Sequence, residues 1–523
     1  MEITSPNSLW KDYDVTALPL NPSELSEKTE DGIKVRELYF DGFINVDGRA
    51  RAFVRIHENP NAKGVILYIP DISSPTDTVR QEFYEHGYTV MTLDYAGKTD
   101  ERARFTLYPR SLNGCNYDKD KIREAPEDAL TSCWFVWTCI ARRAVLLARE
   151  MYPELKAFAI GRGLGGSIAY KLCAFNDGLT ACTTLLNIIP DVTGQGNRII
   201  NYRAALDNSA YASILKTPIF IAVCSNAEDG SLDKMAELAH TTASLKCFRI
   251  LERAFSDSIK VSFDQVDRFF TEYLNGTIKP SAITVKPTNS ENKLYFNINI
   301  GGENDEEKRE VELFAAFCIT NPTFRNWTSI KTVRLGGTEY YARVDVFQNE
   351  QPVYAFVNIT DGAGNVTTSP LLTVIPKSLS IPAQTAVPRR LIYDGSMGKD
   401  VWLSPRGGKA RVETGPFGIN GVVCDENTMV TFKPGDFLYH ASRDALLQII
   451  VNGKCTTMTV TVSDGKERYM STVKISNSEE WHKFTLSHND FKSKIGPLAD
   501  WSKIILFKLE ADDTFIISSV LWV

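Results

Sequence analysis

The sequence predicts an α/β domain with a mostly parallel, doubly wound sheet, followed by two all-β sandwich domains. Three observations predict this fold class. Apolar strand-like runs alternate with helical stretches up to about residue 280, helical periodicity then disappears, and a glycine-rich turn at residues 161–166 joins a strand to a helix. The chain of 523 residues is 43% hydrophobic and 23% charged. This length and composition fit roughly three globular domains.

The first predicted domain spans residues 1–280. Helical patterns at residues 128–151 and 263–274 lie between its strands. Buried strands that alternate with helices are typical of a parallel sheet covered on both faces. We expect the first two strands to form an antiparallel edge. The predicted strands are residues 51–56, 64–69, 89–93, 157–160, 183–189, 218–223 and 246–251.

The rest of the chain predicts two β domains, residues 281–378 and 379–523, with a linker near residues 376–388. Short alternating strands in a unit of about 100 residues favour an immunoglobulin-like sandwich for the first. The second is predicted to be a jelly roll. The predicted strands are 293–300, 311–317, 340–346, 353–359 and 371–375, then 446–451, 458–462, 483–486, 504–509 and 515–521.

Charge and cysteine usage exclude several function classes. The net charge is −6 and basic residues are scattered, so we expect no nucleic-acid partner. No run of about 18 uncharged apolar residues predicts a membrane span. The ten cysteines show no metal-binding spacing, and the start shows no secretory pattern. We therefore expect reduced cysteines, a cytoplasmic protein, no metal and no cofactor.

The glycine-rich turn has the frame of a nucleophile elbow. Residues 161–166 read Gly-Arg-Gly-Leu-Gly-Gly after a predicted strand, and in the motif G-x-S-x-G a serine occupies the centre. A dinucleotide site would need this turn after the first strand of its unit, which is not its place here. With Tyr68-Ile-Pro70-Asp71 and Leu93-Asp94-Tyr95, the turn makes residues 35–280 resemble the α/β-hydrolase superfamily, in its acetylxylan esterase and dienelactone hydrolase-like branch.

The resemblance implies a triad in the order serine, acid, histidine. The serine position is Gly163. The acid position falls at Ala227 or its neighbour Asn226, and Asp229 reaches it only if the loop shifts.

The histidine position lies within Ala254, Phe255 and Ser256, and no histidine occurs between His240 and His440. Without an imidazole a serine lacks its general base, so the resemblance predicts a lost triad.

The turn itself has a reason to persist without catalysis. A serine at an elbow is strained, and glycine relieves that strain because it has no Cβ. The backbone N–H groups of Leu164 and of Ile72, after Asp71, are where an oxyanion hole is expected. We expect a small carboxylate or acyl group to bind there.

Other nucleophiles stay open as alternatives. Ser73 and Ser74 lie near the expected oxyanion site, Ser167 lies one turn past the elbow, and Cys115, in an expected loop, is a candidate for an exposed thiol. We expect each of them to be a polar loop or helix residue. None has a visible histidine partner. His86 and His240 are expected to be structural or surface residues.

The C-terminal region resembles galactose-binding-like carbohydrate-binding modules, through the stretches at residues 480–491 and 498–507. Trp481 and Trp501 alternate with apolar neighbours and are expected in the core. The aromatic residues in Gly/Pro-rich loops are better candidates for stacking on sugar rings. They are Trp402, Phe417, Phe437 and Tyr439.

These observations favour a catalytically silent hydrolase that acts by binding an acylated carbohydrate or a protein partner. Two alternatives remain. One is an active carboxylic-ester hydrolase of the acetylxylan esterase type with a non-standard nucleophile. The other is a structural protein in which the sandwiches mediate assembly, since fold alone does not decide function.

Overall fold

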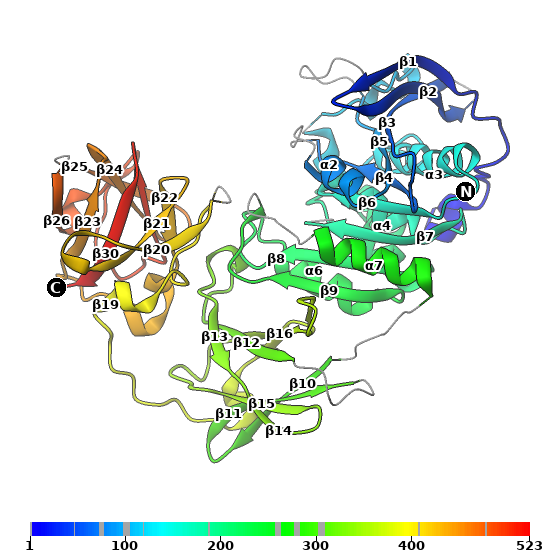
Figure 1. Ribbon diagram of the computed structural model, residues 1–523. Helices are drawn as coiled ribbons and strands as arrows, with labels where there is room; N and C mark the ends of the chain where they lie inside the picture. The colour runs from blue at the N-terminus through cyan, green and yellow to red at the C-terminus, as the bar shows by residue number, and fades with distance from the viewer. Residues whose placement is uncertain are drawn as a thin grey trace. The chain divides into compact units, whose positions relative to one another are not determined.

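The computed structural model (Figure 1) describes most of the chain. The chain forms two compact units. The first unit comprises Met1–Val223, Asp233–Arg249 and Val261–Ser281, and the second comprises Cys224–Leu232, Ile250–Lys260 and Ala282–Val523. The described residues are 3–45, 48–72, 78–97, 105–118, 120–186, 189–256, 263–276, 283–301, 309–405, 408–475 and 478–523.

A nine-stranded mixed sheet forms the centre of the first unit, in the order β1-β2-β3-β5-β4-β6-β7-β8-β9. Strands β5, β4, β6, β7 and β8 run parallel. All five residues of β4 are buried, which requires cover on both faces of the sheet. The strands are β1 (Ser23–Glu30), β2 (Ile33–Asn45), β3 (Gly48–Glu58), β4 (Val65–Ile69), β5 (Thr89–Asp94), β6 (Ala157–Arg162), β7 (Leu179–Leu185), β8 (Ile219–Cys224) and β9 (Leu245–Leu251).

Seven α-helices of the described residues accompany this sheet. Helix α3 packs against α4, and α2 packs against α7. The start of α3 is fixed by Ser132, whose Oγ accepts the Phe135 N–H at 3.2 Å. The helices are α1 (Pro6–Trp10), α2 (Thr78–Glu85), α3 (Cys133–Met151), α4 (Leu164–Leu172), α5 (Gly196–Ala205), α6 (Leu232–Thr241) and α7 (Phe263–Asn275). This arrangement of helices and strands confirms the predicted α/β class with a mostly parallel sheet.

The antiparallel edge differs from the prediction. It is formed by β1, β2 and β3, whereas the predicted edge strand at residues 64–69 is β4, a central strand parallel to β5 and β6. Five buried residues in a row mark β4 as an interior strand. The predicted edge was therefore wrong in its second strand.

The second unit begins with two antiparallel sheets that share one hydrophobic core. Leu294 and Phe296 of one sheet and Leu313 and Val357 of the other belong to the same buried cluster. One sheet is β10 (Ile283–Ser290), β11 (Lys293–Ile300), β15 (Glu339–Val344) and β14 (Val333–Gly336). The other is β13 (Thr328–Lys331), β12 (Glu310–Phe317), β16 (Val353–Thr360) and β17 (Val366–Thr368), with β18 (Leu372–Val374) paired to β16. Ile381, in the predicted linker, is buried in this core.

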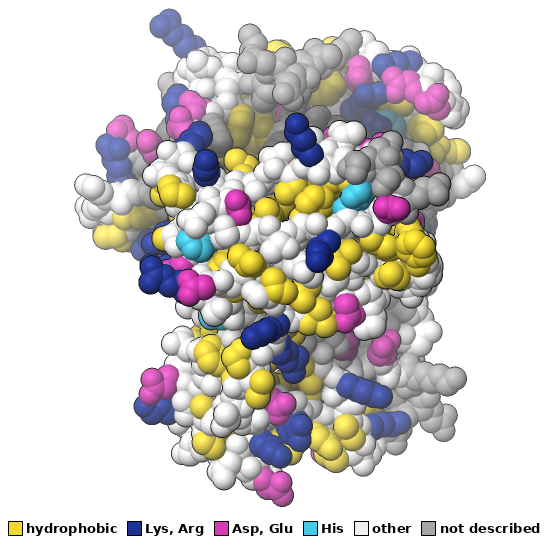
Figure 2. All heavy atoms as spheres, turned by 90° about the vertical axis from the view of Figure 1, so that its left-hand side faces the viewer, with side chains coloured by type: hydrophobic (Ala, Val, Ile, Leu, Met, Phe, Trp, Pro, Cys, Tyr) yellow, Lys and Arg dark blue, Asp and Glu magenta, His cyan; other side chains and the backbone are white. Residues whose placement is uncertain are grey.

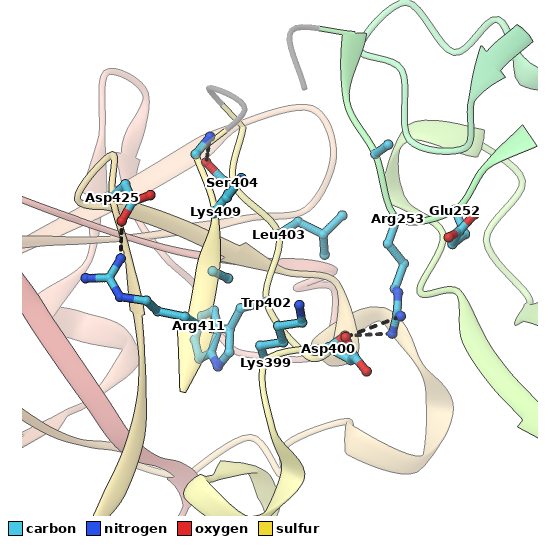
Figure 3. A pocket seen from close by; sticks show the side chains of 13 residues that line it. Glu252, Arg253, Lys399, Asp400, Trp402, Leu403, Ser404, Lys409, Arg411 and Asp425 are labelled. Carbon is cyan, nitrogen blue, oxygen red and sulfur yellow. Dashed lines mark hydrogen bonds and ion pairs between the residues drawn. The ribbon is translucent and has the colours of Figure 1, made fainter. Parts of the chain in front are cut away.

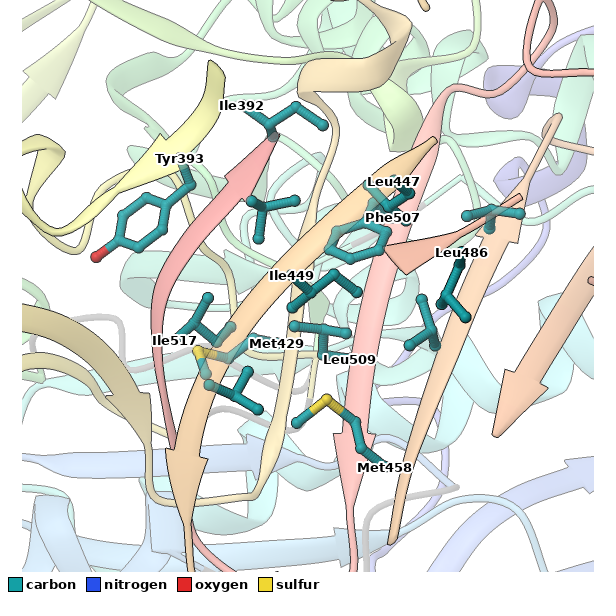
Figure 4. Close-up of a cluster of buried hydrophobic side chains, with 14 of the residues drawn as sticks. Ile392, Tyr393, Met429, Leu447, Ile449, Met458, Leu486, Phe507, Leu509 and Ile517 are labelled. Atoms are coloured by element: carbon teal, nitrogen blue, oxygen red, sulfur yellow. The ribbon is translucent and has the colours of Figure 1, made fainter. Parts of the chain in front are cut away.

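Two further antiparallel sheets follow and enclose a second core (Figure 4). Met429, Ile449 and Leu509 lie in it. One sheet is β20 (Ala410–Thr414), β21 (Asn420–Cys424), β30 (Phe515–Trp522), β23 (Leu447–Gly453) and β26 (Ser478–Leu486), with β19 (Leu391–Asp394) on β30. The other is β22 (Thr428–Thr431), β29 (Leu506–Ala511), β24 (Thr457–Ser463), β25 (Arg468–Lys474), β27 (Lys492–Ser493) and β28 (Gly496–Pro497). The β class is confirmed, while the immunoglobulin-like and jelly-roll types and the domain boundaries stay predictions.

The surface mixes both signs of charge. On the face drawn in Figure 2, Lys and Arg side chains alternate with Asp and Glu over the described atoms. None of the helices in the described ranges has both the length and the apolarity that a membrane crossing needs. All ten cysteines are unpaired, and seven of them are buried.

Candidate functional site

The predicted elbow is present in the first unit as a tight turn between β6 and α4. Gly163 has φ +53° and ψ −120°, a backbone conformation that residues other than glycine adopt only under strain. Its N–H donates to the carbonyl oxygen of Leu185 at 3.0 Å. The turn is half-buried, so its outer face meets solvent.

The flanking glycines are required by close packing. A Cβ on Gly165 would collide with the carbonyl oxygen of Ile69 at the end of β4, and a Cβ on Gly161 would lie 2.6 Å from the Cβ of Ala169. Helix α4 therefore rests directly on the strand ends. The glycine pattern read from the sequence is the backbone of an elbow, whatever residue stands at its centre.

Asp71 occupies the space that a nucleophile would need. A Cβ built on Gly163 would lie 2.6 Å from the Asp71 Cγ, 2.8 Å from its Oδ1 and 3.0 Å from its Oδ2. Separations below 3.0 Å do not occur for real Cβ atoms, so one of the two groups would have to move. The elbow is filled by a carboxylate of the chain itself.

The same carboxylate engages the expected oxyanion donor. The Leu164 N–H, at the first position of α4, donates to Asp71 Oδ1 at 3.3 Å. An anion at a helix N-terminus is favoured by the free N–H groups and the helix dipole. Of the three predicted pocket residues, the structure thus joins Asp71 and Leu164. The described residues show no hydrogen bond at the N–H of Ile72.

The predicted acid position belongs to the second unit, where its loop is bound to the first β domain. Asn226 is fully buried, and its Nδ2 donates to the carbonyl oxygens of Thr323 at 3.0 Å and Arg325 at 2.9 Å. The Thr323 hydroxyl donates to the carbonyl oxygen of Ala227 at 2.7 Å. Ala227 is 3% exposed and carries no acidic group. These three hydrogen bonds hold its loop against residues 323 and 325.

The predicted histidine position is also a packing site in the second unit. Phe255 is 5% exposed and lies in a cluster with Leu403, Val430 and Phe432. The carbonyl oxygen of neighbouring Ala254 accepts the Asn226 N–H at 3.0 Å, and the Ser256 N–H donates to Glu228 Oε2 at 3.2 Å. The loop ties the two predicted positions together through its backbone.

The alternative nucleophiles of the first unit are structural where they are described. Ser167 is 1% exposed and donates to Asn208 Oδ1 at 3.1 Å. Cys115 is fully buried, and burial raises the pKa of its thiol well above the usual range. The alternative of an exposed thiol at Cys115 was therefore wrong. Ser73 and Ser74 lie outside the described residues.

The histidines of the first unit have other environments. His86 follows α2 and lies 3.5 Å from Asp264 and 3.6 Å from Asp267. His240 ends α6 and is exposed. His57, on β3, is 4% exposed, and burial lowers its pKa to about 3.

A groove of about 730 Å³ lies within the second unit (Figure 3). Its walls carry two ion pairs, Arg253 with Asp400 and Arg411 with Asp425. Figure 3 shows Lys399 and Trp402 between these pairs. The lining is completed by Glu252, Ala254, Leu403, Ser404, Gly408, Lys409 and Ala410.

The four predicted aromatic candidates divide by exposure. Trp402 is 4% exposed and lines this groove, and its Nε1 has no hydrogen-bond partner among the described residues. Tyr439 is 8% exposed, and its hydroxyl accepts Arg389 Nη1 at 3.3 Å. Phe417 is 88% exposed at φ +58°, and Phe437 is 36% exposed.

The two tryptophans expected in the core differ. Trp501 is 2% exposed and donates through Nε1 to the Ala445 carbonyl oxygen at 2.7 Å. Trp481 is half-buried and donates to the Pro416 carbonyl oxygen at 3.0 Å. Only the groove around Trp402 combines an unsatisfied ring N–H with a cavity among these aromatic residues.

Comparison with known proteins finds similar solved structures for about half of the chain. Acetyl xylan esterase 1 from Thermoanaerobacterium is 12% identical with a TM-score of 0.40 and covers 52% of this chain and 95% of its own. Acetyl xylan esterase from Paenibacillus is 13% identical (TM-score 0.36; 50% and 90%). Dienelactone hydrolase from Anabaena variabilis is 13% identical (TM-score 0.28; 49% and 99%).

Neither a family model nor a curated protein matches the sequence. Identities this low assign no activity to the chain. What the structure establishes is a first unit with a nine-stranded, mostly parallel sheet, followed by antiparallel β-sheets, with the chain's own Asp71 carboxylate beside the turn at Gly163.

Proposed function

We propose that this protein is a catalytically silent α/β-hydrolase that acts by binding. The observation that carries the proposal is the Asp71 carboxylate, which lies where a side chain at position 163 would begin. The same carboxylate accepts a hydrogen bond from the Leu164 N–H. Acyl transfer needs a nucleophile, a base and an oxyanion donor at one place. At this elbow the first is missing and the last is engaged.

An esterase assay tests the proposed lack of catalytic activity. Wild type, Gly163→Ser and the double variant Gly163→Ser/Asp71→Ala are offered p-nitrophenyl acetate and acetylated xylan. We expect hydrolysis no faster than buffer for all three, because freeing the elbow does not supply an imidazole. Turnover that a single Ser or Cys substitution abolishes would instead support the alternative of an active esterase with a non-standard nucleophile.

The ligand of the proposed binding function is an acylated carbohydrate, with a protein partner as the alternative. The groove beside Trp402 supports a saccharide, since it is open, about 730 Å³ in volume and lined by polar side chains. Among the described residues no carboxylate forms an ion pair with Lys399 or Lys409. Hydroxyl and acyl oxygens of a sugar are acceptors for these donors and for Trp402 Nε1.

Affinity electrophoresis on acetylated plant polysaccharides tests the groove. We expect retardation of wild type that weakens in Lys399→Ala/Lys409→Ala and in Trp402→Phe, which keeps the buried ring but removes its N–H. Lys494→Ala removes an exposed lysine outside the groove and is the matched control. Unchanged retardation in all variants would refute the groove as the sugar site.

The structural alternative has its own signature. A mass that rises with concentration, with neither ester hydrolysis nor polysaccharide binding, would favour assembly through the β domains. A cytoplasmic location remains part of the proposal. Its support is the set of ten unpaired cysteines.

A further inference from the structure

A buried lysine in the first unit has no hydrogen-bond partner. Lys171 lies on α4, two turns beyond the elbow, and is 1% exposed. Its Nζ is buried and makes no hydrogen bond, and no acidic side chain of the described residues lies within ion-pair distance of it. Such groups are rare in native proteins and call for an unseen partner.

The ammonium group faces aromatic rings. Lys171 Nζ lies 5.1 Å from the ring centroid of Trp134 and 5.9 Å from that of Tyr211. These cation–π contacts attract the charge but accept no N–H in a directed hydrogen bond. Three N–H donors therefore remain unmet.

Two further donors of the same region are unmet. Trp134 Nε1 and Tyr202 Oη are buried without a partner, with 1% and 2% exposure of their residues. Tyr202 lies on α5, which packs against the 3-10 segment η3 (Asn208–Ile214) that carries Tyr211. Lysine and indole groups donate only, so what the cluster lacks is an acceptor.

Two tyrosine hydroxyls beside the cluster are paired. Tyr211 Oη accepts Trp10 Nε1 at 2.7 Å and donates to the Ala205 carbonyl oxygen at 3.0 Å. On α4 itself, Tyr170 Oη is bonded to Thr242 Oγ1 at 2.7 Å. Thr183 and Thr184, on β7 beside α4, also have hydroxyls without a partner, but of these groups only Lys171 carries a charge.

The Asp207 carboxylate lies near enough for its charge to favour the ammonium, but it forms no ion pair with Lys171. Asp207 Oδ1 accepts the N–H and the hydroxyl of Ser209 at 2.8 and 2.6 Å. Burial raises the pKa of the Cys133 thiol to about 12, so it is uncharged at neutral pH. Burial lowers the pKa of Lys171 to about 8, which leaves most of the ammonium charged at pH 7.

We propose that Lys171, Trp134 and Tyr202 hold a small monovalent anion inside the first unit, of the size of chloride or acetate. The anion supplies the acceptors that five N–H and O–H groups lack and balances the buried charge. Its site is independent of the proposed elbow and groove, and nothing in it requires ester hydrolysis.

Thermal unfolding of the full chain in different salts tests the proposal. At constant ionic strength, chloride or acetate replaces gluconate, a carboxylate too large for an internal site. We expect a saturable rise in Tm of about 3 °C for wild type with chloride or acetate, because an anion that binds only the folded chain stabilises it. Gluconate alone should give no rise.

A matched pair of variants locates the effect. Lys171→Met removes the charge at nearly constant volume and should abolish the anion-dependent rise. Lys63→Met is the control, because Lys63 Nζ also lies over an aromatic ring, 4.6 Å from the Tyr88 centroid, but has an acidic partner in Asp267 at 2.6 Å. Its anion dependence should equal that of wild type.

Equilibrium dialysis of wild type with labelled chloride keeps the test decisive if Lys171→Met does not fold. About one bound chloride per chain is expected, with weaker binding in Tyr202→Phe. No bound chloride together with an equal Tm in all salts would overturn the proposal and leave internal water as the acceptor. An equal rise in wild type and Lys171→Met would overturn it too.

Discussion

The elbow after β6 and the loops after β8 and β9 differ in what fixes their residues. At the elbow, backbone geometry requires Gly161 and Gly165, and the centre of the turn is filled by a neighbouring carboxylate. In the loops, side chains are fixed by the β-sheets they pack on, as Asn226 and Phe255 show. Under the proposed function, ester hydrolysis is therefore absent for two reasons. The first reason is the residues at the elbow, which single substitutions can change. The second is that the two loops belong to the core of the second unit.

The largest effect is expected where the predicted histidine position is a packing site. Phe255→Ala should lower the free energy of unfolding of the second unit by about 4 kcal/mol, because it empties part of a buried cluster. Urea unfolding, with hydrogen exchange to identify the affected unit, measures this. Phe417→Ala removes an equal ring that is 88% exposed and should change stability by less than about 0.5 kcal/mol.

Restoring an acid should be costly as well. Asn226→Asp should destabilise the second unit by about 3 kcal/mol, because a buried carboxylate would face the two carbonyl oxygens that now accept from Nδ2. Asn226→Ala leaves the same acceptors unmet without adding charge, so it should cost less. If Asn226→Asp were as stable as wild type, the loop would not be a fixed part of the β domain.

Acid should lower the stability of the first unit through His57. The pKa of His57 is lowered to about 3 in the folded first unit, against about 6.5 in an unfolded chain. The unfolded state therefore binds the proton first, and this stability is full above pH 6.5 and lost as pH falls toward 3. At pH 5 the loss is about 2 kcal/mol.

Hydrogen exchange at pH 7 and pH 5, corrected for the intrinsic rates, should show this loss in the first unit. His57→Leu should remove most of it. If the first unit of that variant still loses stability between pH 7 and pH 5 as wild type does, His57 is not its source.

Sequence patterns predicted those helices and strands that a periodic pattern of apolar residues marks clearly. Residues 263–274 and 293–300 match α7 and β11 closely, because a strong apolar face or a strict alternation marks each. Strands β1 and β2 were not predicted. The residues of β1 are mostly exposed and charged, so they carry no apolar pattern.

For the candidate site, the loss of the nucleophile, acid and base stays a prediction, which rests on residue identity at the positions that the resemblance implies. The sequence did not predict that Asp71 fills the elbow, because this depends on the meeting of the ends of β4 and β6 at atomic distances. It also did not predict that Ala227 and Phe255 belong to the second unit. A packing contact with a β domain some 70 to 175 residues later in the chain leaves no local pattern.

The claim that Asp71 occupies the nucleophile position is tested most directly by a double-mutant cycle. Gly163→Ala adds only the Cβ, so it should cost about 2 kcal/mol in wild type through strain and contact with the carboxylate. In the Asp71→Ala background only the strain remains, and the cost should fall by about 1 kcal/mol. A cost that is the same in both backgrounds, measured by urea unfolding of the first unit, would contradict the account.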